Sequence, residues 1–394
     1  MMKIVQLNMS CGVGSTGKIC VEISEILNRE HIENYILYSS KTNGYANGIS
    51  CSNDAYIKMQ ALKSRIFGNY GFNSKRATER MIAELDRIKP DIVHLHNLHG
   101  HDCHLGMLLS YLEEKKIKLF WTFHDCWTFT GYCPYFTMAQ CDNWQSGCGR
   151  CVLRKNFSWF FDKSAKNLAR KKEAMSGLDL TIITPSQWLA DMVQQSFLRE
   201  YDVKVIINGI NLKVFQPTPS DFRKKYGLDD KKIVLGVSFF WDRRKGTDVF
   251  IELAQRLPED YQIVLVGTNE QVDRLLPKNI ISIHRTQNQQ ELAEIYTAAD
   301  VFANPTREEV LGLVNLEALA CGTPGVTFRS GGSPECYDET CGSVVACDDI
   351  DAFEKEIIRI CRDKPYSEEA CRNRAALFDK DQKFREYFDL YVGE

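Results

Sequence analysis

The sequence predicts an α/β protein with two doubly wound parallel sheets, each forming a Rossmann-like domain. Short apolar runs alternate with longer amphipathic stretches through both halves of the chain, which is typical of parallel sheets covered by helices. With 394 residues, the chain is too long for one ordinary hydrophobic core. A Gly- and Ser-rich turn between the first strand and the first helix is a third feature of such folds.

Composition excludes several classes of protein. Hydrophobic residues make up 44% and charged residues 26%, as expected for a soluble globular chain. The formal net charge of -3 argues against a general nucleic-acid binder. No run approaches the ~18 apolar residues of a membrane helix, and the first residues become polar too soon for a signal peptide. We therefore expect a cytoplasmic protein.

The first strand covers residues 3–9 and the first helix residues 18–30. The turn between them, residues 10–17, is rich in glycine and serine, so its backbone amides can approach a phosphate closely. It matches neither the Walker pattern nor a complete dinucleotide fingerprint, and a flexible turn explains it equally well.

Two basic stretches have two explanations each. Residues 56–89 are predicted to be helical, with lysine and arginine among aromatic residues and methionine. Residues 154–176 combine seven basic residues with Phe157, Trp159, Phe160 and Phe161. Each stretch is either a solvated basic face or a contact with the anionic surface of a membrane.

Histidines gather where two predicted strands end. The strand beginning at residue 91 runs into a loop with Asn97, His99 and His101, and the strand of residues 118–123 is followed by His124. Residues at the carboxyl ends of parallel strands line the ligand crevice of such folds, so we expect Asn97, His99 and His101 in a pocket. A histidine at a strand tip, such as His124, is by itself more often structural. A metal site here is a weaker alternative, because no carboxylate completes it at helical spacing.

The chain has fifteen cysteines, an odd number. Without a secretory signal, an odd number argues against a disulfide framework. The segment 126–151 holds five of them, and Cys133, Cys141, Cys148 and Cys151 have the number of thiolates that a tetrahedral structural zinc ion needs. Reduced thiols and a disulfide remain open as alternatives.

The most informative stretch is residues 305–324. It follows a short apolar strand and contains a helix that Gly312 opens and Gly322 and Pro324 close. Glu309 precedes the helix N-terminus, where amides and the helix dipole attract an anion, and Glu317 lies on the inward face. This pattern indicates a diphosphate near residues 310–314, a polyol bound by Glu317 and a sugar near Glu309. Capping and salt bridging by the two acids is the alternative.

The same stretch resembles the Glu-(seven residues)-Glu signature of retaining family-4 glycosyltransferases. The residues that match are Glu309, Gly312, Glu317, Ala318, Ala320, Gly322 and Pro324. Val310 and Leu311 replace the usual Gly and Phe. Residues 206–217 resemble the interdomain segment of the family. The cysteine-rich segment 126–151 resembles an insertion in its colanic-acid and capsule branch.

The resemblance implies the GT-B fold, with two Rossmann-like domains facing across a cleft. An N-terminal acceptor-side domain is expected at residues 1–200 and a nucleotide-sugar-binding domain at 201–375. Residues 376–394 would form a C-terminal helix that returns to the first domain.

The resemblance also assigns roles to residues. Glu309, His124 and Lys245 would be catalytic, and Asn97, His99, His101 and His124 would bind the acceptor. The donor-binding residues would be Gly14, Arg243, Arg244, Lys245, Arg285, Thr286, Glu309, Leu311, Gly312, Leu313, Val314 and Glu317. Because Ser238 and Phe239 stand where the family has a phosphate-binding arginine, Arg243 or Arg244 would replace it.

The implied reaction is transfer of a sugar, with retention of configuration, from a UDP- or GDP-linked donor to a hydroxyl group. The acceptor would be a lipid-linked or other saccharide in bacterial surface polysaccharide synthesis, with peripheral contact at the inner face of the membrane. Catalysis would need no metal, since fixed cations and amides would stabilise the leaving diphosphate. A sugar-nucleotide epimerase and a non-catalytic nucleotide-sugar-binding protein are the alternatives.

Overall fold

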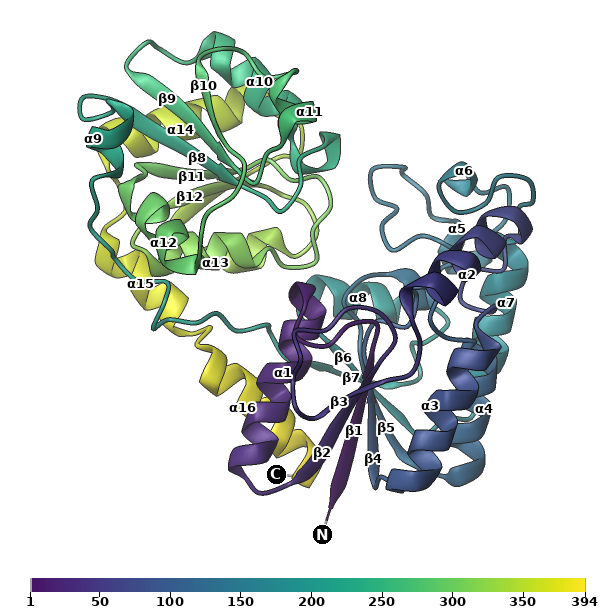
Figure 1. Cartoon of the computed structure of the whole chain (residues 1–394). Helices are drawn as coiled ribbons and strands as arrows, with labels where there is room; N and C mark the ends of the chain where they lie inside the picture. The colour runs from purple at the N-terminus through teal and green to yellow at the C-terminus, as the bar shows by residue number, and fades with distance from the viewer. Residues whose placement is uncertain (1, 394) are drawn as a thin grey trace. The chain divides into compact units, whose positions relative to one another are not determined.

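The computed structural model describes residues 2–393 and divides them into two compact units (Figure 1). The first unit contains the residues up to Ile207 together with the end of the last helix, from Phe384 onward. The second unit is Asn208–Lys383. Each unit is built on one parallel sheet, which confirms the predicted α/β class with two doubly wound, Rossmann-like domains.

The sheet of the first unit has seven parallel strands in the order β3-β2-β1-β4-β5-β6-β7. Their bounds are β1 Lys3–Asn8, β2 Glu33–Tyr38, β3 Gly48–Ser50, β4 Ile92–Leu95, β5 Lys118–Thr122, β6 Leu180–Thr184 and β7 Asp202–Val205. The central strands β1 and β4 are almost entirely buried, as expected for a sheet covered on both faces.

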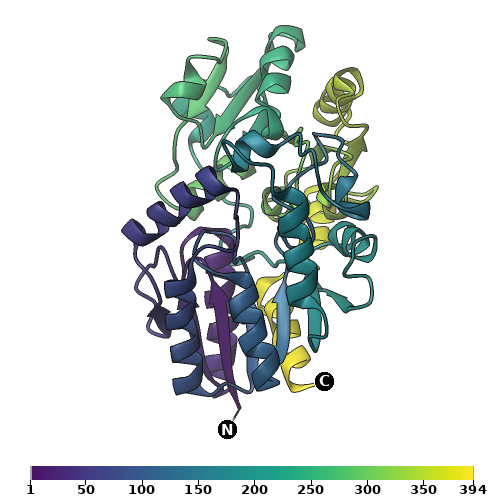
Figure 2. The ribbon, with the colours of Figure 1, turned by 90° about the vertical axis from the view of Figure 1, so that its right-hand side faces the viewer.

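Helices pack on both faces of this sheet (Figures 1 and 2). They are α1 Gly14–Arg29, α2 Asp54–Phe67, α3 Lys75–Ile88, α4 Leu105–Lys115, α5 Asn143–Ser146, α6 Arg154–Phe157, α7 Ser164–Met175 and α8 Gln187–Gln194, with a 3-10 turn η1 at Trp127–Phe129. The end of α16 (Lys380–Val392) lies beside α1 and buries Phe384, Tyr387 and Tyr391 in the same core as Ile19 and Ile23.

The boundary between the domains differs from the expectation. The second domain was expected to begin at residue 201, but β7 (Asp202–Val205) pairs with β6 and completes the first sheet. Residues 56–89 are largely helical, as predicted, and form two helices, because Gly68 adopts a left-handed conformation after α2 and ends it. Sequence periodicity shows that a strand exists but not which sheet it joins.

The second unit has six parallel strands in the order β10-β9-β8-β11-β12-β13. The strands are β8 Lys232–Val237, β9 Tyr261–Val266, β10 Ile280–Ile283, β11 Val301–Asn304, β12 Gly325–Phe328 and β13 Gly342–Val345. The helices are α9 Phe222–Tyr226, α10 Thr247–Arg256, α11 Glu270–Asp273, α12 Gln289–Ala298, α13 Leu313–Ala320, α14 Ile350–Asp363 and α15 Glu368–Ala376, with 3-10 turns η2 Arg243–Lys245 and η3 Ser333–Cys336.

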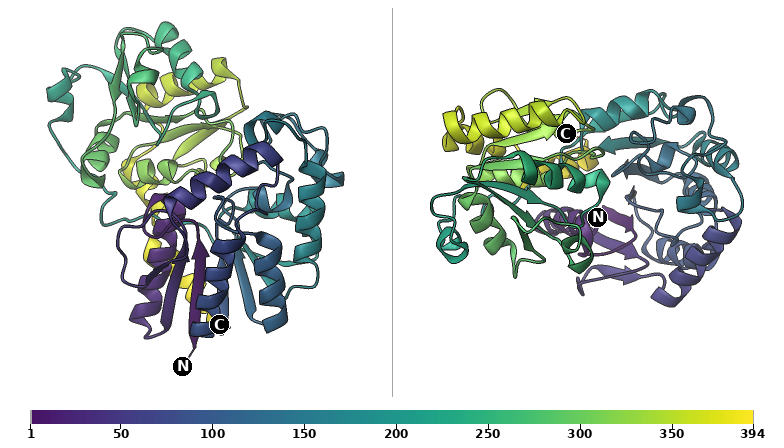
Figure 3. Two further views of the ribbon diagram at one scale, coloured as in Figure 1. Left: turned by 45° about the vertical axis from the view of Figure 1, so that its right-hand side comes forward. Right: turned by 90° about the horizontal axis from the view of Figure 1, so that it is seen from above.

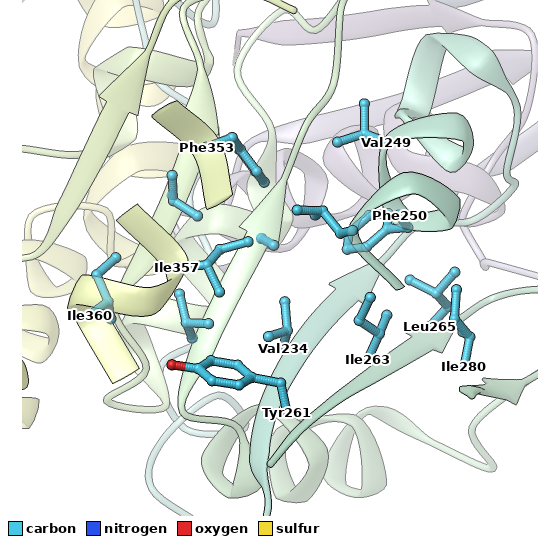
Figure 4. Packing of buried hydrophobic residues seen from close by; sticks show 14 of the residues in the cluster. Val234, Val249, Phe250, Tyr261, Ile263, Leu265, Ile280, Phe353, Ile357 and Ile360 are labelled. Atoms are coloured by element: carbon cyan, nitrogen blue, oxygen red, sulfur yellow. The ribbon is translucent and has the colours of Figure 1, made fainter. Parts of the chain in front are cut away.

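Figure 4 shows the core of this unit, where Phe250 of α10 and Phe353 and Ile357 of α14 pack against side chains of the sheet, including Val234 and Ile263. Burying aromatic and branched side chains on both faces holds the strand ends at fixed positions. The loops that leave those strands therefore start from a rigid frame.

Both sheets reverse their strand order at one point, between β1 and β4 in the first and between β8 and β11 in the second. In open parallel sheets, ligands bind at the carboxyl ends of the strands next to this reversal. The loops of interest are therefore those after β1 and β4 and those after β8 and β11. None of the helices within residues 2–393 has the length and apolar character needed to span a bilayer.

Candidate functional site

The loop between β11 and α13 brings Glu309 and Gly312 together. Gly312 has φ +86°, a left-handed conformation that lets the chain turn into α13. A Cβ at Gly312 would lie 2.8 Å from the Nδ2 of Asn315 and 3.2 Å from the Cγ of Glu309. Glycine is therefore required by both conformation and space. Leu311 is buried, and Leu313 and Val314 form the half-exposed first turn of α13.

Lys245 reaches Glu309 from the neighbouring loop after β8. It ends the 3-10 turn η2, which Asp242 caps by accepting a hydrogen bond from the Lys245 amide at 2.9 Å. Gly246 then passes so close to β11 that a Cβ there would lie 2.5 Å from the carbonyl oxygen of Pro305. The Lys245 ammonium forms an ion pair with the Glu309 carboxylate, and both side chains remain partly exposed.

The arginines of this region hold the loops in place. Arg307, which the sequence did not single out, is buried and forms ion pairs with Asp248 at 2.8 Å and with Asp348 at 2.6 Å. Arg244 donates to the carbonyl of Glu308 at 3.3 Å, whereas Arg243 is exposed and lies 3.8 Å from Asp248. Of the two candidate phosphate-binding arginines, Arg244 is thus the one bonded to the Glu308–Gly312 loop.

A buried amide network lies beneath the loop. Asn315 accepts a hydrogen bond from the Nδ2 of Asn304 at 2.8 Å and donates to the Oγ of Ser333 at 2.9 Å. The carbonyl of Glu309 accepts from the amide of Gly332 at 3.1 Å. Asn315 was missed in the sequence, although a buried asparagine in an apolar helix is a signal, because such a group needs partners.

Glu317 lies one turn along α13, on a half-buried face. Its Oε2 accepts a hydrogen bond from the hydroxyl of Tyr296 at 3.1 Å. Burial, followed by the charge of Glu317, raises the pKa of Tyr296 well above its ordinary value. Tyr296 therefore stays protonated and keeps its hydrogen available to the carboxylate. Both acids of the signature thus have protein partners.

Three other predicted donor residues follow elements other than β8 and β11. Arg285 and Thr286 follow β10, the edge strand of the second sheet. Gly14, with φ +71°, is the first residue of α1 in the first unit. The assignment of Gly14 to the donor site stays a prediction.

In the first unit, a chain of hydrogen bonds fixes the tautomer of His124. Gln6 donates its Nε2 amide to the carbonyl of Cys20 at 2.9 Å, so its Oε1 faces the Nε2 of His96 at 3.1 Å. Because an amide oxygen only accepts, His96 donates from Nε2 and accepts at Nδ1 from the Nε2 of His124, 3.2 Å away. His124 is left with an unprotonated Nδ1.

Burial keeps these imidazoles neutral. It is the largest cause that lowers the pKa of His124 to about 4, with Asp125 opposing and His99 adding to the shift. Burial also lowers the pKa of His96 well below its ordinary value. At neutral pH, His124 is therefore an uncharged group. Within residues 2–393 no hydrogen bond engages its Nδ1, which can accept one from a hydroxyl group.

His99 forms a second hydrogen-bonded chain. Its Nε2 lies 2.8 Å from Asp125 Oδ2 and its Nδ1 lies 3.2 Å from the Tyr70 hydroxyl. Burial opposes protonation of His99, but the charge and hydrogen bond of Asp125 raise its pKa above the ordinary value. With both nitrogens engaged, His99 acts as a positioning residue. Asp125 and Tyr70 were not among the predicted site residues.

The other two predicted acceptor residues flank these chains. His101 contacts the Tyr70 ring at 4.9 Å between centroids, and its Nδ1 lies 3.1 Å from the hydroxyl oxygen of Ser64. The amide of Asn97 donates to the Oδ1 of Asn8 at 3.1 Å, which ties the loop after β4 to the end of β1. Asn97, His99 and His101 therefore follow β4, at the strand reversal of the first sheet, and His124 follows the next strand, β5.

The four cysteines proposed to hold zinc lie near one another. Burial raises the pKa of Cys133 to about 12, and the charges of Cys151, Cys148 and Cys141 contribute to the shift. Among residues 2–393, however, no three His, Cys, Asp or Glu side chains are arranged to hold a metal ion. The zinc site stays a prediction, which metal analysis of the purified protein would test.

Two family models cover most of the sequence. The model described as Glycosyltransferase Family 4 matches residues 56–214, and the model described as Glycosyl transferases group 1 matches residues 220–377. The first match falls in the unit with the histidine chains. The second contains the Lys245–Glu309 pair and all of α13.

Three individual proteins are similar to this chain over nearly its full length. The chain is 22% identical to a colanic acid biosynthesis glycosyl transferase, WcaC, of Escherichia coli strain K12, with 99% of both chains covered. The sucrose-phosphate synthase of Thermosynechococcus elongatus has a similar fold, with a TM-score of 0.74, 18% identity and coverage of 100% of this chain and 99% of that one. The HepE protein of Anabaena in complex with UDP-glucose gives a TM-score of 0.65 at 16% identity, with both chains fully covered.

Proposed function

This chain belongs to the group 1 and family 4 glycosyltransferases of GT-B fold, and from that premise we propose that it transfers a sugar, with retention of configuration, from a nucleoside diphosphate sugar to a hydroxyl group. The proposal rests on one observation above all. The Lys245–Glu309 ion pair lies at the strand reversal of the second sheet, directly before the N-terminus of α13.

This arrangement suits a leaving diphosphate. The first amides of a helix have no acceptor within the helix, and the helix dipole is positive there. Lys245 and Arg244 add two cations next to these amides. Fixed cations and dipoles stabilise charge that develops on a leaving group without having to reorganise during the reaction. We assign this role to Lys245, Arg244 and the amides of Leu313 and Val314, without a catalytic metal.

Glu309 and Glu317 would contact hydroxyl groups. Since Lys245 holds Glu309 beside the helix start, its carboxylate would accept hydrogen bonds from the transferred sugar. Glu317, held by Tyr296 one turn further, would bind the ribose. Arg285 and Thr286, after the edge strand β10, would contact the base. The UDP-glucose complex of the similarly folded HepE supports a uridine donor, with a guanosine donor as the alternative.

The histidine chains of the first unit suit an acceptor that is a neutral alcohol. His124 Nδ1 would accept a hydrogen bond from the reacting hydroxyl, with Asn97, His99 and His101 around it. The relationship to a colanic acid biosynthesis enzyme supports an acceptor from surface polysaccharide synthesis, either a lipid-linked saccharide or a free one.

The test is turnover of defined donors. The purified protein is incubated with UDP- and GDP-linked hexoses and candidate acceptors, and release of nucleoside diphosphate and the anomeric configuration of the product are measured. Transfer with retention supports the proposal. Isomerisation of donor alone would identify an epimerase instead, and tight binding of every donor without turnover would identify a binding protein.

A further inference from the structure

Helix α2 (Asp54–Phe67) buries polar side chains and exposes several apolar ones. Its two buried side chains are polar, Gln60 and Ser64, whereas Met59, Leu62 and Phe67 are 44%, 49% and 49% exposed. A helix on the surface of a globular protein normally buries its apolar face and exposes its polar one. The apolar side chains of Met59, Leu62 and Phe67 are therefore exposed, while other apolar residues of α2, such as Ile57 and Ile66, are partly buried.

The polar inward face of α2 has a structural reason. Ser64 accepts a hydrogen bond from the Nδ2 of Asn73 at 2.7 Å and bonds His101 at 3.1 Å, so this face is used to hold the loop after β4. No such reason explains the outward apolar residues. An exposed apolar stripe of this kind marks a surface that meets another apolar phase.

A second exposed apolar segment lies beside α2. Trp159, Phe160 and Phe161, which follow α6 in sequence, are 51%, 66% and 52% exposed. Two hydrogen bonds hold this segment in place: the Trp159 amide donates to the carbonyl of Arg65 at 2.7 Å, and Arg154 donates to the carbonyl of Trp159 at 2.8 Å. The three aromatic side chains are thus exposed on an ordered backbone. Figure 3 (left) shows α2 as the dark-blue helix near the loops of α5 and α6.

The charge around these two segments is strongly positive. Residues 54–67 and 150–166 contain eight lysine and arginine residues and only two aspartates, in a chain whose net charge is -3. Lys58, Lys63, Lys155 and Lys166 are exposed. We call the exposed side chains of α2 and of residues 150–166 together the aromatic-basic face.

We propose that the aromatic-basic face docks on an anionic lipid bilayer. Aromatic side chains favour the headgroup region, and each lysine or arginine near an anionic surface adds about 1 kcal/mol of attraction. A protein partner fits less well, because protein–protein interfaces are depleted in lysine. A bilayer suits a surface on which lysine residues surround apolar side chains. The methylene stem of each lysine lies along the apolar surface, while its charge remains in water near the lipid headgroups.

Sedimentation with vesicles tests this proposal without donor or acceptor, so its outcome does not depend on the proposed function. Wild-type protein is expected to sediment with phosphatidylglycerol–phosphatidylcholine vesicles at low salt, and to be released as salt is raised. Replacing the three aromatics, Trp159→Ser with Phe160→Ser and Phe161→Ser, should lower the partition coefficient at least about tenfold. Lys58→Ala with Lys63→Ala should lower it roughly fivefold for each lysine.

Two variants in the second unit serve as matched controls. Leu275 and Leu377 are 66% and 58% exposed, so Leu275→Ser and Leu377→Ser remove comparable apolar surface outside the face. They should bind vesicles like wild type. Thermal unfolding of every variant shows whether it is folded, and transfer to a water-soluble acceptor should be unchanged in the folded face variants.

Tryptophan fluorescence locates the contact. Of the six tryptophans, all within the described residues, Trp159 is the one that is exposed. Anionic vesicles should shift its emission to the blue, and Trp159→Phe should abolish the shift while vesicle binding is largely kept. Wild type that stays in the supernatant with anionic vesicles, or a triple aromatic variant that binds as wild type does, would overturn the proposal.

Discussion

The two units have the same strand order but place opposite chemistry where that order reverses. In the second unit, the loops after β8 and β11 bring together a lysine and a glutamate, both charged groups, at a helix start. In the first, the loops after β4 and β5 place His96 and His124 in a chain that burial keeps neutral. The second unit thus presents an ion pair at a helix start, whereas the first presents the neutral His96–His124 chain beside the His99–Asp125 pair.

The difference follows from what each position is proposed to bind. A diphosphate carries negative charge through the reaction, so fixed cations and helix amides stabilise it. An alcohol is neutral and needs an acceptor for its hydrogen, and a protonated imidazole could not provide one. The fold fixes where ligands bind, and side-chain chemistry decides which ligands bind there.

The largest effect should come from breaking the charged pair. We expect Lys245→Met to lower kcat by about 10²- to 10³-fold, because one fixed cation at a leaving group is worth a few kcal/mol. Glu309→Gln should cause a comparable loss, since it removes the partner that holds Lys245. Steady-state kinetics with the best donor measure both effects.

Lys232→Met provides the control for these variants. Lys232 forms an exposed ion pair with Asp260 at 2.7 Å in the same unit, away from the loops of the site. Exposed pairs contribute about 0–1 kcal/mol, so activity should hardly change. A Lys245→Met enzyme with wild-type kcat would refute the assigned role.

Replacing His124 in the neutral histidine chain should reduce activity less than breaking the charged pair does. We expect His124→Phe to lower kcat/KM about 10- to 100-fold, and His124→Asn, which keeps an acceptor oxygen, to lower it less. Because the pKa of His124 lies at about 4, its imidazole stays neutral from pH 8 down to pH 6. The loss should therefore be constant over that range and activity should fall only as the pH approaches 4.

A pH profile of kcat/KM for wild type and both His124 variants tests whether His124 stays neutral over this range. His31→Asn, a change of an exposed histidine in the same unit, is the control. If wild type showed an acidic limb near pH 6.5 that His124→Phe removed, the neutral chain would be the wrong description of this unit.

Asp102 tests the cost of burying a charge in the first unit. The residue is fully buried, and burial is the largest cause that raises its pKa to about 6 from 3.8, against opposing backbone amides and His99. Between pH 3.8 and pH 6, Asp102 is protonated in the folded protein and ionised in the unfolded one. The free energy of unfolding therefore falls as the pH rises toward 6. Asp102→Asn should therefore stabilise the protein by about 2 kcal/mol at pH 7.5, and by much less at pH 4.5.

Urea unfolding at the two pH values measures this difference. Asp179→Asn, at an exposed position of the same unit, should leave stability within about 0.5 kcal/mol at both. Equal effects of Asp102→Asn at pH 4.5 and pH 7.5 would show that Asp102 does not carry a strained charge.

The smallest effect is expected at Glu317. Glu317→Gln should weaken the binding of UDP or GDP about tenfold, because a hydrogen bond to a charged acceptor contributes about 1.5–3 kcal/mol. Calorimetry measures the dissociation constants. With 2′,3′-dideoxy nucleotides, which lack both ribose hydroxyls, wild type and variant should bind alike. An unchanged dissociation constant for the ordinary nucleotide would contradict the ribose contact.

Predictions from the sequence were most accurate for features that depend on residues close together along the chain. Alternating apolar runs gave the parallel α/β class, and the spacing of Glu309, Gly312 and Glu317 gave a helix with a glycine at its start. Local propensity and turn chemistry decide such features, since they involve residues close in sequence.

The sequence failed where partners lie far apart along the chain. Gln6 and His96 are separated by 90 positions, and Arg307 and Asp248 by 59, yet each pair is bonded. A buried glutamine in an apolar strand and a buried asparagine in an apolar helix were detectable as residues that need partners. Their partners were not detectable, because no local pattern encodes strand order.

By itself, the sequence determined the class of fold, the two acids of the signature and the glycine that turns the chain between them, because backbone sterics and helix periodicity act over a few residues. The tertiary structure alone decided that Lys245 meets Glu309, that β7 belongs to the first sheet and that His124 keeps an unprotonated nitrogen. It also decided that Met59, Leu62 and Phe67 of α2 are exposed. These outcomes depend on which surfaces pack together and on how far burial removes a group from water, and both are properties of the folded chain as a whole.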